Sequence, residues 1–541
     1  MAFDSLGQFV AALRRAGELI EIRPRVSPRL EIAEISDRVV KAGGPALLFT
    51  NVDGSAYPVL MNQFGSEKRM ALAFGAANLE EVARRVRNAV RLNVPSTANG
   101  KVAKLFSIGS AAFAVPRTVT KAPCQEVVEP DIDLMKLPVL TTWPLDAGPF
   151  ITLPLVFTKD PESGQQNVGM YRLQRYDATT TGMHWQKHKQ GRAHAAKWGR
   201  HVPVAVAIGA DPAITYAATA PLPPIVDEIA IAGFLRGRNV PMVRCKTIDM
   251  KVPAGAEFVL EGYVDNDDMR VEGPFGDHTG VYSLADHYPT FHVQCITHRR
   301  DPIYAATVVG KPPMEDAWLG KATERLFLPL LQMVVPEIVD YNLPVEGGFH
   351  NLCIVSVKKS YPGQAKKVMN ALWGLGHMLM LTRTLLVVDD DVDVHDVRAV
   401  AWFALNNVDA SRDLVVMPGP VDDLDHSGSH LVSLGHKLGI DATRKRADEG
   451  YERTWPPDII MDTQTRALVS RRWNEYGLAR MATRGDAWSG QGERALATLL
   501  GSAAERSAGT RTPAIRAGSV DATGLQRNDV PAIDSTRHDE R

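Results

Sequence analysis

The run Glu257-Phe258-Val259-Leu260-Glu261-Gly262-Tyr263 is short, largely apolar and rich in β-formers, and runs of this kind decide the fold of the chain. Comparable runs occupy residues 151–157, 202–208 and 288–296, and turn-forming proline and glycine lie between them. Many short strands punctuated by turn signals predict a barrel-like or sandwich domain. One helix, at about residues 224–236, is expected to interrupt this domain.

The segments on either side mix helices with strands. Before the β-rich region, four apolar residues from Leu6 to Leu13 recur at helical spacing, and residues 45–49 and 58–61 are strand candidates. After it, helices are expected at 321–340 and 364–378, and buried strands at 352–357 and 381–388. The fold class predicted is α/β (α+β), with an N-terminal α/β domain (1–115), the β-rich middle domain (116–315), a C-terminal α/β domain with a terminal helix (316–482) and a mostly disordered tail (483–541).

The composition and charge of the chain limit the kinds of partner that it is expected to bind. The chain has 541 residues, with 61 basic and 62 acidic side chains and a net charge of −1. This balance gives no electrostatic reason to expect nucleic acid or an acidic membrane as a partner. No secretory signal is seen, and the most apolar stretch, residues 326–335, is too short to span a bilayer. We therefore expect a cytoplasmic protein whose widely spaced cysteines are reduced: Cys124, Cys245, Cys295 and Cys353.

A first cluster of polar residues lies in the middle domain. It consists of Asn167-Val168-Gly169-Met170-Tyr171-Arg172 and, shortly after, Met183-His184-Trp185-Gln186-Lys187-His188. On a helix, His184 and His188 would share one face and could bind a metal. Position 185 is Trp, so the metalloprotease HExxH pattern is absent. Asn167 alone is typical of a turn, and the histidines alone are typical of surface or hydrogen-bonding residues.

An isolated acidic pair, Asp227-Glu228, follows this cluster. Glu228 begins the predicted helix, where a carboxylate ordinarily complements the helix dipole. The same carboxylate is also a candidate ligand for a hard metal ion.

The second cluster is Glu272-Gly273-Pro274-Phe275-Gly276-Asp277-His278. The glycines and the proline are compatible with a tight loop that returns both acids to one side, although a solvated turn is the alternative. Two adjacent carboxylates cannot both ionise easily, so we expect the pKa of one to rise while a nearby arginine lowers the pKa of the other. The sequence contains no P-loop, no GxGxxG after a strand and no GxSxG elbow.

Both clusters, together with Leu434-Gly435-His436-Lys437-Leu438-Gly439-Ile440-Asp441-Ala442-Thr443, give the chain a resemblance to UbiD-type decarboxylases. The resemblance covers about residues 5–480 and is greatest to the bacterial 3-polyprenyl-4-hydroxybenzoate decarboxylases. Asp277 stands where the fungal cinnamate-type members have Glu, which favours that bacterial branch. The resemblance implies a split β-barrel middle domain that binds prenylated FMN and Mn²⁺, often with K⁺.

The resemblance also assigns roles to residues. The metal ligands would be Asn167, His188 and Glu228, whose oxygen and imidazole donors suit Mn²⁺ better than they suit a soft metal. The catalytic network would be Arg172, Glu272 and Asp277, with Asp277 protonating the carbon after CO₂ leaves. The cofactor contacts would be Met170, Tyr171, Arg172, His184, Trp185, Gln186 and Lys189, with Lys437 a weaker candidate for the phosphate.

The activity implied is reversible, non-oxidative decarboxylation of an aromatic or α,β-unsaturated carboxylic acid, 4-hydroxybenzoate derivatives included. The implied partners are that acid, a flavin prenyltransferase as cofactor supplier, and further copies of the chain in a dimer or hexamer. A polyprenylated substrate would add membrane association. One alternative is a flavin- and metal-binding subunit of a larger aromatic carboxylase complex. Another is a split-barrel FMN reductase, which would not need the metal ligands.

Overall fold

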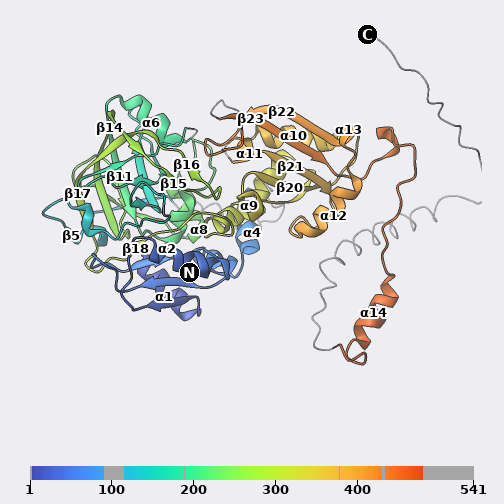
Figure 1. Cartoon of the computed structure of the whole chain (residues 1–541), viewed down its shortest axis with the longest axis horizontal. Helices are drawn as coiled ribbons and strands as arrows, with labels where there is room; N and C mark the ends of the chain where they lie inside the picture. The colour runs from blue at the N-terminus through green and yellow to red at the C-terminus, as the bar shows by residue number, and fades with distance from the viewer. Residues whose placement is uncertain (1–2, 91–114, 188, 377, 429–432, 479–541) are drawn as a thin grey trace, which may run out of the picture.

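The computed structural model describes residues 3–90, 115–187, 189–376, 378–428 and 433–478 (Figure 1). Helices and strands are mixed in three main sheets, which confirms the predicted α/β (α+β) class. His188 and the predicted tail at 483–541 lie outside the described residues. No described helix combines the length and apolar character needed to cross a membrane.

The N-terminal part is a four-stranded sheet of order β1-β2-β3-β18 with helices packed against it. Its first helix, indicated by the apolar spacing from Leu6 to Leu13, begins after Ser5, whose Oγ accepts a hydrogen bond from the backbone N–H of Gln8. The last strand, β18, follows the middle part in sequence but pairs with β3, so the chain returns to its first sheet. The elements are α1 (Leu6–Arg15), β1 (Leu19–Ile22), α2 (Glu31–Lys41), β2 (Ala46–Phe49), β3 (Val59–Met61), α3 (Glu67–Ala73), α4 (Leu79–Val90) and β18 (Tyr304–Ala305).

The middle part is a curved seven-stranded sheet of order β10-β17-β14-β11-β7-β8, with β5 paired to β17 (Figure 1). Val202, Val204 and Val206 alternate along β11 and are fully buried in the main core. The strands are β5 (Val127–Val128), β7 (Pro154–Lys159), β8 (Gln166–Met170), β10 (Thr180–Gly182), β11 (His201–Ile208), β14 (Phe258–Glu272) and β17 (Asp286–His298). This sheet confirms the expected barrel-like middle region.

Shorter elements surround this sheet. They are a three-stranded sheet of β4 (Arg117–Val119), β12 (Pro241–Arg244) and β13 (Lys251–Pro253); the pairs β6 (Phe150–Ile151) with β9 (Leu173–Gln174) and β15 (Phe275–Gly276) with β16 (Tyr282–Ser283); helices α6 (Gln190–Trp198), α7 (Pro212–Ala217) and α8 (Glu228–Arg236); and the 3-10 turns η1 (Pro123–Gln125) and η2 (Leu134–Lys136).

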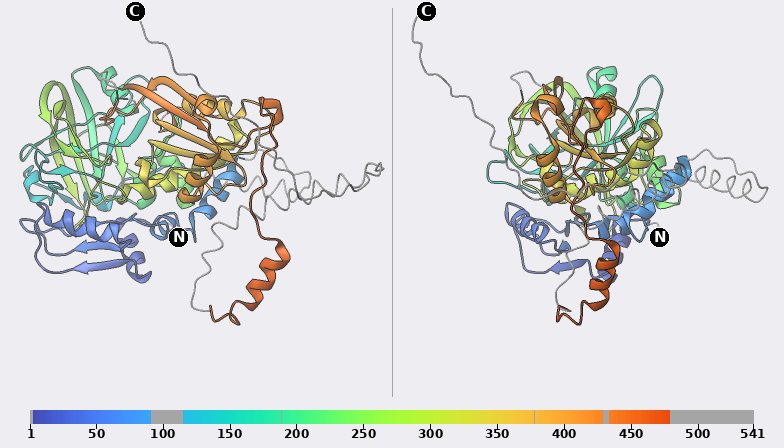
Figure 2. Two further views of the ribbon diagram at one scale, coloured as in Figure 1. Left: turned by 45° about the vertical axis from the view of Figure 1, so that its right-hand side comes forward. Right: turned by 90° about the vertical axis from the view of Figure 1, so that its right-hand side faces the viewer.

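The C-terminal part is a five-stranded sheet of order β19-β20-β21-β23-β22. Helix α10 packs on one face and α12 on the other, each with its own apolar core. Figure 2 shows α14 standing apart from all the sheets. The elements are α9 (Asp316–Val334), β19 (Ile338–Asn342), η3 (Val345–Gly347), β20 (Leu352–Val357), α10 (Gln364–Gly374), α11 (Met378–Leu381), β21 (Thr384–Asp389), α12 (Val397–Asn407), α13 (Ala410–Asp413), β22 (Leu414–Pro420), β23 (Leu434–Asp441), η4 (Ala447–Glu449) and α14 (Thr463–Arg472).

Several predicted boundaries were wrong, among them the end of the helix expected at 364–378, which is α10 and ends at Gly374. The helix expected at 321–340 is α9, which ends at Val334, because Pro336 disfavours helical backbone at the residue before it. The helix expected from 224 begins only at Glu228, since Asp227 is its N-cap. β14 is much longer than the apolar run that predicted it, because its second half alternates half-buried polar residues (Asn266, Asp268 and Arg270) with exposed ones (Asp267, Met269 and Val271).

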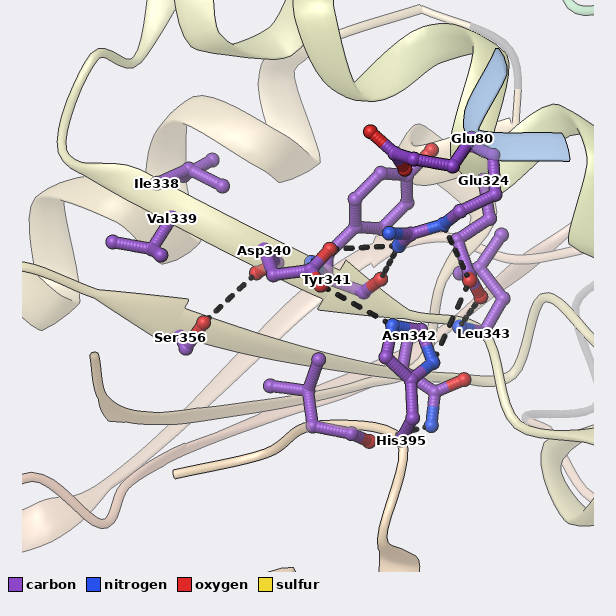
Figure 3. Close-up of polar contacts among 12 residues, drawn as sticks. Glu80, Glu324, Ile338, Val339, Asp340, Tyr341, Asn342, Leu343, Ser356 and His395 are labelled. Carbon is purple, nitrogen blue, oxygen red and sulfur yellow. Dashed lines mark hydrogen bonds and ion pairs between the residues drawn. The ribbon is translucent and has the colours of Figure 1, made fainter. Parts of the chain in front are cut away.

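A buried polar cluster joins α9 to the C-terminal sheet (Figure 3). Glu324 on α9 is 1% exposed, and its carboxylate accepts hydrogen bonds from Lys321 Nζ (2.9 Å), Arg325 Nε (3.1 Å) and the backbone N–H of Leu343 (2.6 Å). Arg325 also donates to Asp340 on β19 at 2.7 Å. This cluster fixes the C-terminal sheet on the helix that reaches back to the N-terminal part.

Replacing Glu324 with Gln should destabilise the fold by about 3 kcal/mol, because it removes the buried carboxylate that two partly buried cations, Lys321 and Arg325, share. Guanidinium unfolding followed by circular dichroism measures this loss. The control is Glu80→Gln, which removes a half-exposed carboxylate whose nearest cation, on Arg87, is 3.8 Å away, and it should cost less than about 1 kcal/mol. Equal unfolding midpoints for the two variants would contradict the assignment.

Candidate active site

A cavity of about 590 Å³ lies between the middle sheet and the C-terminal part. This volume is in the range of small-molecule and cofactor sites. The middle part contributes the end of β8, the segment after β10, the start of α8 and the turn after β14. The C-terminal part contributes Phe349, His350, Leu381, Asp422, Asp423 and Leu424.

Aromatic packing shapes the wall at the end of β8. The Tyr171 ring lies over Gly169, where a Cβ atom would be only 2.5 Å from the ring, so this position needs glycine. Trp185 meets Tyr171 edge-on, with ring centroids 5.4 Å apart, and the Tyr171 hydroxyl accepts a hydrogen bond from Gly191 N at 3.2 Å. The indole Nε1 of Trp185 has no partner among the described residues, so it is a donor available to a ligand.

The structure brings Arg172, Glu272 and Asp277 together at one end of this cavity. Arg172 Nε and Nη2 donate to the two carboxylate oxygens of Glu272 at 2.8 and 3.1 Å, and Nη1 donates to Asp277 Oδ2. Glu272 is fully buried and Asp277 is 8% exposed. A guanidinium held on two sides by carboxylates has a fixed plane and a fixed position.

The turn between the two acids folds as its glycines predict. Gly273 has φ of +87°, a left-handed conformation that suits glycine. At Gly276 a Cβ atom would lie 2.2 Å from the Trp143 ring, so only glycine allows this close packing. The turn thus brings Asp277 back to Arg172, on which Glu272 also lies.

The expected split of the two carboxyl pKa values is wrong. Burial raises the pKa of Glu272, but hydrogen bonds from His184 (3.1 Å) and Arg172 outweigh it and lower the pKa to about 2. Burial likewise raises the pKa of Asp277, but His278 and Arg172 hold it well below its usual range. Each acid has a histidine partner besides the shared arginine, and the lowered pKa values keep both acids ionised at neutral pH.

Two of the three predicted metal ligands line the cavity, and His188 lies outside the described residues. Asp227 caps α8 through the N–H groups of Ile229 and Ala230, which leaves the Glu228 carboxylate beside the backbone of Val168 at 3.3 Å. Burial raises the pKa of Glu228 to about 7. The amide nitrogen of Asn167 has no partner among the described residues. A buried acid without a cation fits a metal ion, which would bind the oxygen of the Asn167 amide and not its nitrogen.

No group of three or more His, Cys, Asp or Glu among the described residues is arranged to hold a metal. That finding does not test the predicted set, because the set contains an asparagine and His188. The three-ligand metal site stays a prediction.

The predicted cofactor contacts divide into two groups. Met170, Tyr171, Arg172, His184, Trp185, Gln186 and Lys189 all line the cavity. Burial lowers the pKa of Lys189, whose ammonium lies 5.5 Å from the Tyr171 ring centre, so a phosphate would stabilise its charge. Lys437 is not in the lining: its ammonium donates to the carbonyls of Met380 and Thr382 at 2.6 and 3.0 Å, inside the C-terminal part. It is therefore not placed to meet a phosphate in this cavity.

Two histidines of the site were not predicted. His278 Nδ1 lies 2.8 Å from Asp277 Oδ1, and its Nε2 lies 2.6 Å from Nε2 of His350, which comes from the C-terminal part. His278 ends the second cluster of the sequence, directly after Asp277, but it was assigned no role there. His350 has only a weak signal, its place in a Gly-Gly-Phe-His loop before a buried strand.

Comparison with known proteins agrees with this geometry. Three domains of 3-octaprenyl-4-hydroxybenzoate carboxy-lyase match the chain in order: the N-terminal domain at 10–86, the Rift-related domain at 117–312 and the C-terminal domain at 317–442. An uncharacterized protein of Archaeoglobus fulgidus is 55% identical over 480 residues, which is 88% of this chain and 99% of that relative. The chain belongs to the UbiD family, and it is a carboxy-lyase.

Solved structures of the same class are similar throughout. The UbiD-class enzyme HmfF from Pelotomaculum thermopropionicum, in complex with FMN, is 30% identical, with a TM-score of 0.70 over 84% of this chain and 97% of that one. Vanillic acid decarboxylase from Sedimentibacter hydroxybenzoicus in its closed form is 27% identical, with a TM-score of 0.76 over 88% and 99%. Its open form gives a TM-score of 0.71 over 88% of this chain and 100% of that one.

Glu228→Gln should stabilise the metal-free protein by about 3 kcal/mol near pH 8 and have little effect near pH 5. The folded-state pKa of Glu228 is raised to about 7 from 4.5, so wild-type stability is present at low pH and is lost as the pH rises through 7. Thermal unfolding in EDTA at both pH values measures the difference. The exposed control Glu346→Gln should change nothing, and a pH-independent effect of Glu228→Gln would refute the unpaired buried charge.

Proposed function

We propose that this carboxy-lyase removes CO₂ from an aromatic or α,β-unsaturated carboxylic acid, 4-hydroxybenzoate derivatives included, with prenylated FMN and Mn²⁺ bound in the cavity. The observation that carries the proposal is Arg172, fixed between Glu272 and Asp277 beside a cavity of cofactor size. HmfF has been solved with FMN and with prFMN, and that enzyme is similar over most of its length.

Asn167, His188 and Glu228 would hold the metal ion, and Lys189 with the Trp185 indole would meet the polar groups of the flavin. The bound metal would neutralise the Glu228 carboxylate. Prenylated FMN, when bound, supplies the carbon nucleophile and the electron sink. A flavin prenyltransferase would supply this cofactor. We retain K⁺ as a further expected ion, and a homo-oligomer in the cytoplasm as the expected state.

The remaining chemistry belongs to side chains of this chain. Arg172, fixed in plane by Glu272, binds and orients the substrate carboxylate. Asp277 gives a proton to the carbon that loses CO₂. Phe349, His350 and Leu424 close the cavity from the C-terminal part and exclude water from the reacting atoms.

Asp277→Asn should lower turnover by about 10² to 10⁴, the usual contribution of a positioned acid, while flavin and Mn²⁺ stay bound. Turnover of an aromatic acid and deuterium exchange at the product carbon measure the effect after coexpression with a flavin prenyltransferase. The exposed Asp286 provides the matched control, since Asp286→Asn should keep wild-type rates. If the Asp277→Asn enzyme, with flavin and Mn²⁺ fully bound, decarboxylates the acid and exchanges deuterium at wild-type rates, then Asp277 is not the proton donor.

His188→Ala should lose Mn²⁺, whereas His184→Ala should keep Mn²⁺ and bind flavin less tightly. The reason is that His184 Nδ1 already lies 3.1 Å from Glu272, on the substrate side of the cavity. Metal analysis and flavin absorbance of the purified variants separate the two outcomes. Equal loss of Mn²⁺ in both variants would show that the metal and flavin roles of the two histidines are assigned wrongly.

A further inference from the structure

Decarboxylation with replacement of CO₂ by hydrogen consumes one proton per turnover, and the protein must supply it. If the proposed function holds, Asp277 delivers that proton. Asp277 is 8% exposed and carries a strongly lowered pKa, so it is ionised before the substrate arrives. The proton therefore has to be held close by, on a group that can pass it to Asp277.

His278 is the group in contact with the free side of Asp277. Its Nδ1 lies 2.8 Å from Asp277 Oδ1, while the other carboxylate oxygen accepts from Arg172. At the opposite corner of the ring, Nε2 lies 2.6 Å from His350 Nε2. Two ring nitrogens at this distance share one hydrogen between them. Asp277, His278 and His350 thus form one hydrogen-bonded chain along the cavity wall.

The charges around the chain favour an imidazolium at His278. Burial lowers the pKa of His278, but Asp277, and more weakly Asp316 on α9 and Asp422, outweigh it and raise the pKa to about 9. His350 faces His278, Asp422, Asp425 and Asp277; burial and the charge on His278 lower its pKa to about 4. His350 is therefore neutral, and its Nε2 accepts the Nε2–H of a charged His278.

The C-terminal part holds His350 in place through the preceding residue. Phe349 has φ of +51°, a left-handed conformation that is costly for a bulky side chain. Its ring lies 5.3 Å from the His278 ring, and its Cβ packs so closely on Gly320 of α9 that a side chain there would meet it at 2.8 Å. This packing places His350 against His278.

We propose that His278 is the proton store that reloads Asp277 in each turnover, and that His350 acts as a positioning residue that keeps the store charged. The Nδ1–H bond of His278 breaks as the O–H bond of Asp277 forms, leaving a neutral imidazole. The O–H bond of Asp277 then breaks as the C–H bond of the product forms, which leaves Asp277 ionised again. Water that enters the cavity after product release returns a proton to Nδ1, since His278 also lines that cavity.

A titration followed by NMR tests the store without substrate or cofactor. The His278 ring in the wild type should titrate near pH 9. His350→Phe removes the acceptor and should lower that midpoint by about one unit, whereas His350→Gln, which can still accept, should stay within a few tenths. Asp277→Asn should return the titration midpoint of His278 most of the way to the ordinary histidine value. A wild-type midpoint at the ordinary histidine value would overturn the proposal.

Kinetics test the use of the store in the loaded enzyme. In His278→Gln, Asp277 must take its proton from solvent, so kcat should fall about tenfold per pH unit above neutrality while the wild type stays flat to about pH 9, with KM little changed. The control is His436→Gln, an exposed position on β23, which should follow the wild type. If kcat depends on pH in the same way in His278→Gln and in the wild type, His278 is not the proton store, even where Asp277→Asn is inactive. Activity in Asp277→Asn would instead overturn the proposed donor.

Discussion

The site depends on one interaction, the Arg172 guanidinium held between the carboxylates of Glu272 and Asp277. Three charges this well buried persist only because each has a partner at hydrogen-bond distance. Glu272 is the last residue of β14, so the longest strand of the middle sheet sets the position of the whole group. The turn through Gly273 and Gly276 then returns Asp277 to the same arginine.

Charges without a protein partner mark where other molecules belong. Glu228 is a buried acid whose pKa is raised by burial, and Lys189 is a cation whose pKa is lowered for the same reason. Among the described residues, a carboxylate without a neighbouring cation, on Glu228, and an ammonium without a neighbouring anion, on Lys189, line the same cavity. A metal ion and a phosphate-bearing cofactor would neutralise both, which is why the arrangement suits the UbiD-class chemistry so well.

The contacts from the C-terminal part link the overall arrangement of the chain to proton chemistry. His350 reaches His278 across the cavity, because residues of the C-terminal part line it opposite the middle part. The buried cluster around Glu324 fixes that sheet on α9, and Gly320 of the same helix packs on Phe349. One helix therefore sets both the position of the C-terminal sheet and the position of His350.

The sequence by itself determined the elements whose signals are local. Apolar runs predicted β11 and β20, helical spacing predicted α1, and the glycines of the turn after Glu272 predicted that both acids would return to one side. Only the tertiary structure decided the charge states, because the pKa of Asp277 depends on His278, Arg172 and burial together. It also decided which residues meet: His350 joins the site and Lys437 does not. Spacing along the chain carries no information on contacts made across a cavity by residues 72 positions apart.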